Sequence, residues 1–186
     1  MKWFRYVGAA LFLLSMFGLI LISWPVAETQ AEIPLVIEDA IQGKIVLTLP
    51  EYLRAGETQE ISLGIEYDQD NYEGEPPAQL KLINRLEIGS LAISPKGEGH
   101  TLINPDSVAV FVWKIRNDYA GSNSGLVWLF EESADGERFL ILGRKIELLT
   151  RDILGMTYPF ARGLCIGGMV FSLILCVPFF FRRKFS

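Results

Sequence analysis

Two long apolar runs, one near each end of the chain, enclose a middle section in which apolar and polar residues alternate. The first run, residues 7–24, has 18 residues and no charge. As a helix it would be about 27 Å long, close to the thickness of the hydrocarbon core of a bilayer. The second run, residues 160–181, contains one charge, Arg162, near its start. The pattern predicts two transmembrane helices.

The middle section has the two-residue period of β-strands. In "EISLGIEY", Ile61, Leu63, Ile65 and Tyr67 alternate with polar residues or glycine, as in a strand with one wet face. Similar runs cover residues 44–49, 79–83, 90–94, 107–116, 125–132 and 138–149. Residues 135–136, Asp-Gly between two apolar runs, indicate a hairpin. About seven strands in roughly 115 residues favour an all-β, immunoglobulin-like antiparallel β-sandwich.

The stretch "LPEYLRAGETQEISLGIEY", residues 49–67, resembles the start of many bacterial immunoglobulin-like modules: a strand, a glycine turn and an alternating strand. The resemblance implies an architecture and no activity. Trp113 and Trp128 lie on the two most apolar predicted strands, and we expect both to fill the space between the sheets.

These patterns predict a domain organisation. It comprises a cytoplasmic N-terminus (1–6), a transmembrane helix (7–24), a linker (25–43), the extracytoplasmic sandwich (44–150), a second linker (151–159), a second transmembrane helix (160–181) and a basic cytoplasmic C-terminus (182–186).

The distribution of charge predicts the orientation. Residues 26–159 hold 11 of the 17 basic and all 22 acidic groups, a net charge of −11. This field disfavours nucleic acid and anionic headgroups as partners of the middle domain. Positive residues beside a span mark its cytoplasmic side, and here they flank both runs: Lys2, Arg5, Arg182, Arg183 and Lys184. Both termini are therefore expected in the cytoplasm of a bacterium and the middle domain beyond the inner membrane.

Two other interpretations of the apolar ends stay open. Lys2 and Arg5 before the first run, with "TQA" at residues 29–31, also fit a cleaved signal peptide, although signal cores are usually about 7–15 residues long. The C-terminal run with its basic end is also similar to anchors that sortase-type enzymes process, but no LPxTG-like motif precedes it.

Small residues in the second run could allow a close helix contact. Gly163 and Gly167 form a GxxxG pair, and Gly168 and Ser172 repeat the spacing. Such residues let helices approach closely in lipid, so the partner could be the first helix, a second copy or another membrane protein. Equally, glycine is simply common in membrane helices.

The sequence offers little catalytic or metal-binding chemistry. His100 is the only histidine, and we expect it in an exposed turn. Cys165 and Cys176 both lie in the second apolar run, about 16 Å apart along a helix, which is too far for a disulfide. The acidic stretch "EYDQDNYEGE" offers weak calcium candidates, but its spacing fails as an EF-hand loop. These candidates are Asp68, Asp70, Glu73 and Glu75.

The expected function is non-enzymatic. We expect no catalytic residues and no cofactor, and an accessory or scaffold role in which the protein contacts lipid and other proteins. The alternative is a membrane-anchored sensor or receptor that binds a ligand or ion through its acidic loops. A third hypothesis is an enzyme of unrecognised type.

Overall fold

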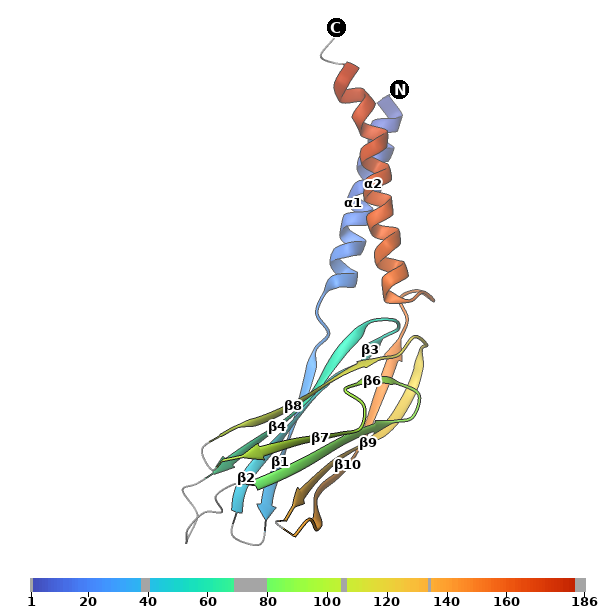
Figure 1. Ribbon diagram of the computed structural model, residues 1–186. Coiled ribbons are helices and arrows are strands. Elements are labelled where there is room, and N and C mark those ends of the chain that lie inside the picture. The colour runs from blue at the N-terminus through green and yellow to red at the C-terminus, as the bar shows by residue number, and fades with distance from the viewer. Residues whose placement is uncertain (1, 38–40, 69–79, 105–106, 134, 183–186) are drawn as a thin grey trace.

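The computed structural model describes residues 2–37, 41–68, 80–104, 107–133 and 135–182. These residues form two helices and ten strands in two five-stranded sheets (Figure 1). The first sheet has the order β1 (Glu28–Ile37), β2 (Ile41–Pro50), β4 (Thr58–Asp68), β8 (Ala109–Arg116), β6 (Ala92–Ser94). The second has the order β3 (Leu53–Arg54), β10 (Arg138–Arg151), β9 (Gly121–Glu132), β5 (Leu80–Ile88), β7 (Glu98–Ile103).

The strand order is that of an immunoglobulin-like sandwich, as the sequence predicted. Strands β2, β4 and β8 occupy the places of strands A, B and E in one sheet, and β10, β9 and β5 those of G, F and C in the other. The short β6 lies beside β8 and β7 lies beside β5, but β6 comes first in the chain, the reverse of the order of C′ and D. After β2 the chain crosses to the second sheet, where the short β3 pairs in parallel with the end of β10. All other strand pairs are antiparallel.

The core lies between the two sheets and consists of alternating side chains from both. Ile61, Leu63 and Ile65 of β4 are fully buried, as the period of this strand predicted. Opposite them, β9 contributes Val127 and Leu129. Because burial of a large apolar side chain contributes about 1.5–3 kcal/mol, this core can stabilise a domain that has no cysteine.

The sandwich begins earlier in the chain than the sequence predicted, so the expected linker over residues 25–43 is corrected. Strand β1 starts at Glu28 and pairs along its whole length with β2. Leu35 of β1 is buried in the core. Pro34 obscured this strand, because proline within an apolar run argues against a central strand; β1 is an edge strand, where proline is tolerated.

Two other expectations on the strands are corrected. His100 lies within β7, opposite Ile83 of β5, and not in a turn, although its side chain is exposed. Trp113 is buried between the sheets as expected. Trp128 is not part of the core: its neighbours Val127 and Leu129 point inward, so Trp128 lies on the outer face of the second sheet, where it stacks on Phe130.

The predicted hairpin at residues 135–136 is confirmed. It connects β9 to β10, and Gly136 has a positive φ of 87°. The Gly136 N–H donates to the Ser133 carbonyl, and the Ser133 N–H donates to the Glu137 carbonyl.

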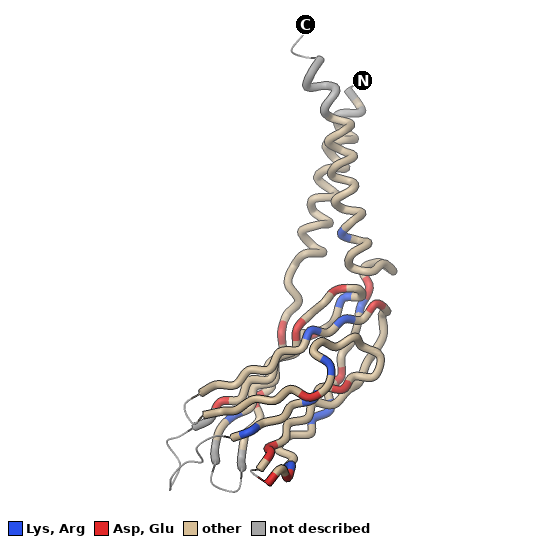
Figure 2. Tube along the Cα trace, viewed as in Figure 1, with Lys and Arg blue, Asp and Glu red and all other residues tan. Residues whose placement is uncertain are grey.

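Helices α1 (Lys2–Ser23) and α2 (Tyr158–Arg182) pack side by side and extend together from one end of the sandwich (Figure 1). Pro159 occupies the first turn of α2, as expected for a residue without a free N–H. By length and composition both helices could cross a membrane, and a signal sequence would also account for the N-terminal one. Residues 6–23 of α1 carry no charge, and residues 158–176 of α2 carry one, Arg162; the ends of the helices are grey in Figure 2.

Candidate functional site

Arg54 connects the sandwich to both helices. Its guanidinium donates a hydrogen bond to the carbonyl oxygen of Trp24, directly after α1. The same group lies 5.4 Å from the ring centroid of Tyr158, the first residue of α2, and 3.5 Å from a carboxylate oxygen of Glu57. Its side chain is only 8% exposed. One buried cation thus contacts both connections between the domain and the helix pair.

Backbone hydrogen bonds reinforce this junction. The Tyr158 N–H donates to the Ala55 carbonyl at 2.7 Å, and the Ala55 N–H donates to the Arg151 carbonyl. Gly56 next to it has a φ of +81°, and a Cβ there would lie 2.9 Å from Cδ of Pro159. The turn before β4 therefore packs directly under the start of α2. The expected linker over residues 151–159 is part of this packed structure.

A small polar cluster supports the turn from the domain side. The Asn117 side-chain amide donates to Oγ1 of Thr150 at 3.0 Å, and the Asn117 carbonyl accepts from the Gly56 N–H at 2.6 Å. Asn117 and Thr150 are both buried. Buried polar groups with satisfied hydrogen bonds fix geometry, so the turn and the end of β10 are held in one position.

A two-residue hairpin projects beside the start of α2. The N–H groups of Ile153 and Met156 each donate to the other's carbonyl. Leu154 and Gly155 form its tip with φ values of 55° and 76°. Leu154 is 91% exposed. A bulky residue rarely adopts a positive φ, so this tip combines backbone strain with an exposed apolar side chain.

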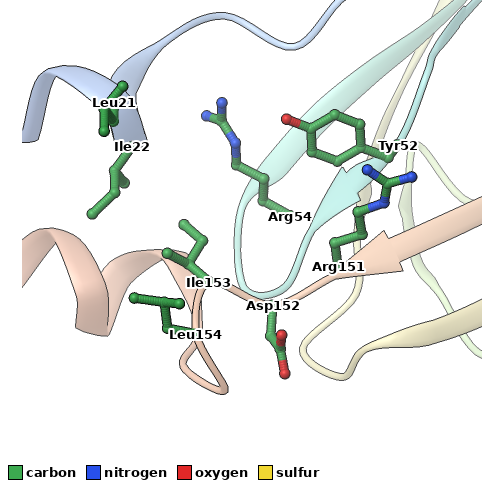
Figure 3. A pocket seen from close by; sticks show the side chains of 8 residues that line it. All are labelled: Leu21, Ile22, Tyr52, Arg54, Arg151, Asp152, Ile153 and Leu154. Carbon is green, nitrogen blue, oxygen red and sulfur yellow. The ribbon is translucent and has the colours of Figure 1, made fainter. Parts of the chain in front are cut away.

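An open cavity of about 320 Å³ lies at the junction. Figure 3 shows Leu21 and Ile22 of α1 on its helix side and the guanidinium groups of Arg54 and Arg151 on its domain side. The cavity is lined by Leu21, Ile22, Tyr52, Arg54, Arg151, Asp152, Ile153 and Leu154.

The charged side chains of the cavity differ in what they contact. Arg54 is paired with Glu57. Arg151 lies over the ring of Tyr52, 4.9 Å from its centroid. Among the described residues, neither Arg151 nor Asp152 has an ion-pair partner within 4.0 Å. The Asp152 carboxylate points away from both guanidinium groups (Figure 3). Arg151 and Asp152, both exposed, are therefore the charged lining residues without an ion-pair partner among the described residues.

The second candidate is an outer apolar patch on the second sheet, away from the core. Its residues lie side by side on neighbouring strands. Phe130 of β9 lies opposite Ile83 of β5 on one side and opposite Leu140 of β10 on the other. Leu140 is 56% exposed and Ile83 is fully buried. We define the outer apolar patch as Ile83, Leu102, Leu126, Trp128, Phe130 and Leu140.

Two ion pairs lie on the same outer face as the apolar patch. Lys81 contacts Glu132 at 2.5 Å, and Arg138 contacts Glu98 at 3.1 Å. The hydrogen bond from Lys81 lowers the pKa of Glu132 below its usual range. Aromatic residues such as Trp128 and Phe130 at the centre of an apolar patch are typical of protein–protein contact surfaces.

The small residues of α2 face two directions. Gly168 and Ser172 lie on the side toward α1: Ser15 of α1 is the nearest residue to Gly168, and Ser172 is fully buried. The Ser172 hydroxyl donates to the Gly168 carbonyl at 2.6 Å. At Gly163 and Gly167, an added Cβ would meet open space. The two overlapping GxxxG-type pairs therefore have different surroundings.

The other residues singled out from the sequence do not form a site. Of the calcium candidates, Asp68 ends β4, while Asp70, Glu73 and Glu75 lie outside the described residues. In the part of the chain that the structure describes, no three His, Cys, Asp or Glu side chains gather as a metal site requires. Cys165 and Cys176 are free thiols on α2.

Sequence reasoning missed the arginine-containing junction. Arg54 stands in "YLRAG", where its contacts with Trp24 and Tyr158 depend on residues 30 positions before and about 100 positions after it. No local pattern marks such a contact. The only hint was Pro50 and Gly56 on either side of the short segment "EYLRA", which indicated a turn but not its position beside the helices.

Comparisons with known proteins show similarity at the level of structure alone. No family model matches the sequence, and no curated protein matches it. Escherichia coli alpha-2-macroglobulin is similar over 61% of this chain, with 12% identity and a TM-score of 0.43, and the chain spans 8% of its length. WR4, an MSP family member of Caenorhabditis elegans, matches over 54% of this chain and 89% of its own, with 9% identity and a TM-score of 0.35. A PapD-like domain of human CEP192 matches over 55% and 77%, with 11% identity and a TM-score of 0.34.

Proposed function

We propose that the protein is a non-enzymatic, two-pass membrane protein that acts as an accessory subunit through its immunoglobulin-like domain. Helices α1 and α2 would cross the bacterial inner membrane with both termini in the cytoplasm. The sandwich would stand directly outside the bilayer and contact another protein of the same membrane.

The observation that carries this proposal is the exposed apolar surface of the helix pair. Leu14 and Phe17 of α1 are 69% and 59% exposed, and Leu164 and Leu173 of α2 are each 53% exposed. The sandwich has a complete core of its own and leaves these side chains uncovered. Lipid would cover them, because a soluble protein rarely exposes so large an apolar surface.

The packing of α1 supports a retained helix over a cleaved signal peptide. Its small residues Gly8, Ser15 and Gly18 face α2, where Cys176, Gly168 and Cys165 are their respective neighbours. Close approach at small residues is how membrane helices associate. A signal peptide, which is removed, has no need for such complementarity.

Cysteine labelling tests the topology, because the extracytoplasmic domain has no native cysteine. We expect Ser122→Cys, at an exposed position of β9, to react with a membrane-impermeant maleimide in intact spheroplasts. Ser186→Cys should react only after permeabilisation, and the wild-type chain gives the background from Cys165 and Cys176. Labelling of Ser186→Cys alone in intact cells would contradict the proposed orientation.

The outer apolar patch supports a contact with another protein. A photo-reactive residue at Leu140, inside the patch, should form one defined adduct in membranes. The matched control is Val110, which is 60% exposed on the outer face of the other sheet. Adducts at neither position, or equally at both, would contradict an accessory role for this patch. Purification in mild detergent would then identify the partner.

A further inference from the structure

The junction cavity is lined by two arginines and one aspartate together with the apolar residues Leu21 and Ile22 of α1. On the premise that α1 and α2 cross the bilayer, as in the proposed function, the cavity lies where the hydrocarbon core gives way to headgroups. We propose that it binds a zwitterionic phospholipid with a primary ammonium group, of the phosphatidylethanolamine class.

The position of the charged groups provides the first step. Arg151 is stacked on Tyr52 at 4.9 Å, which orients its guanidinium, and it has no carboxylate partner among the described residues. Guanidinium groups bind phosphate oxygens with two parallel hydrogen bonds. Arg54 lines the same cavity but already contacts Glu57. Arg151 is therefore the group that would hold the phosphate.

Asp152 provides the second step. It lines the same cavity, and its carboxylate points away from the guanidinium groups (Figure 3). A phosphate at Arg151 and an ammonium at Asp152 would satisfy both unpaired charges at once. An anionic headgroup would pair only with Arg151. It would also be repelled by the net charge of −11 that residues 26–159 carry. The charges thus favour a zwitterion.

The apolar side of the cavity provides the third step. Leu21 and Ile22 belong to the last turn of α1, and Leu154 is 91% exposed at the hairpin tip. In water this tip would combine a strained backbone at Leu154 with an apolar side chain that gains nothing from burial. Beside a bound lipid, Leu154 would contact the glycerol and upper acyl region. The headgroup would therefore contact charged side chains, and the acyl chains would contact apolar ones.

Lipid binding to the full-length protein in detergent micelles tests this proposal by native mass spectrometry. The probes are phosphatidylethanolamine, phosphatidylcholine and phosphatidylglycerol with equal acyl chains. We expect the ethanolamine lipid to bind about tenfold more tightly than the choline lipid, whose methylated nitrogen cannot donate a hydrogen bond to Asp152. Asp152→Asn should remove this preference.

Arg151→Gln should weaken both zwitterionic lipids about tenfold, while the matched control Arg144→Gln, at an exposed position of β10, should leave both unchanged. Thermal unfolding of each variant checks that the fold is intact. Three outcomes would overturn the proposal: equal binding of the ethanolamine and choline lipids, tightest binding of the glycerol lipid, or displacement by free phosphoethanolamine at the same concentration as the lipid. Because binding is read in micelles, failure here with correct cysteine labelling would remove the lipid site and leave the membrane topology standing.

Discussion

At the scale of residues, the two tryptophans of the sandwich have opposite roles although both stand on apolar strands. Trp113 is 2% exposed and contacts the core from β8. Trp128 lies on the outer face, stacked on Phe130 with ring centroids 6.2 Å apart. The stability of the domain should therefore depend strongly on Trp113 and much less on Trp128.

We expect Trp113→Ala to lower the free energy of unfolding by about 3–5 kcal/mol, because it removes a large buried side chain and leaves a cavity. Trp128→Ala should cost clearly less, since its ring is partly in contact with solvent. Denaturant unfolding of the two variants measures the difference. Equal losses would mean that Trp128 belongs to the core after all.

Replacing Arg54 by lysine should lower the stability of the protein, although the exchange conserves the positive charge. Arg54→Lys keeps the charge but loses the planar group that reaches Trp24, Glu57 and Tyr158. We expect a loss of about 2 kcal/mol in unfolding free energy. Arg144→Lys, at an exposed position of β10, is the matched control and should change stability little. Thermal unfolding in detergent compares the two, and equal effects would contradict a structural role for Arg54.

The pair of Glu132 and Lys81 predicts a dependence of stability on pH. Its hydrogen bond lowers the pKa of Glu132 from the usual 4.5. The unfolded chain therefore takes up this proton first as the pH falls, and the stability from the pair is present above pH 4.5 and lost as the pH falls through the lowered pKa. The melting temperature of Glu132→Gln should consequently fall less steeply below pH 4.5 than that of the wild type. Glu51→Gln, at an exposed position, should retain the wild-type slope.

At the scale of elements, the alternation of apolar and polar residues predicted both a strand and its buried face only where polar residues marked the solvent-exposed face. In β4 each inward residue is separated by a polar residue or glycine, so both the strand and its orientation were predicted. In β9, residues 126–130 are all apolar, and periodicity could not decide which side Trp128 faces. Strands β1 and β3 were missed because proline or shortness hid them, and β7 because its sequence, "EGHTLI", is largely polar.

The element predicted most directly, the helix pair, can be tested through its two thiols. A Cβ at Gly8 would lie 2.9 Å from Sγ of Cys176, and one at Gly18 would lie 3.1 Å from Sγ of Cys165. A disulfide needs about 3 Å between a Cβ and the opposite sulfur. We therefore expect Gly8→Cys and Gly18→Cys each to form a disulfide within one chain on mild oxidation.

The control for this experiment is Gly163→Cys, because its added Cβ meets no atom within 4 Å. It should give no disulfide within one chain. Non-reducing electrophoresis followed by mass spectrometry of the linked peptides distinguishes bonds within a chain from bonds between chains. If α1 is removed as a signal peptide, neither cross-link can form, and the retained first helix in the proposed topology would be wrong.

At the scale of the whole molecule, the domain and the helix pair are joined over a short distance. The chain leaves α1 at Ser23 and enters β1 at Glu28, and β10 ends at Arg151, close before Tyr158 begins α2. Arg54 and the hydrogen bond between Tyr158 and Ala55 hold this junction together. In the proposed topology the sandwich would be held close to the bilayer, so its surfaces would meet neighbours in the same membrane.

The extent of the folding unit gives a prediction for the molecule as a whole. A fragment of residues 25–157 keeps both sheets, including β1 and the pairing of β3 with β10. A fragment of residues 44–150 matches the boundaries expected from the sequence but lacks β1 and the start of β2. The shorter fragment loses Leu35, whose burial alone contributes about 1.5–3 kcal/mol, and it exposes β2 as an edge that Pro34 no longer protects.

We therefore expect residues 25–157 to unfold in one cooperative thermal transition, and residues 44–150 to melt at a lower temperature or to aggregate. Circular dichroism and size-exclusion chromatography measure both properties on the purified fragments. Since a domain of this size is stable by only about 5–15 kcal/mol, the loss of a whole edge strand should be decisive. An equal melting temperature for the two fragments would show that β1 adds nothing to the domain, and the sandwich would then begin at β2.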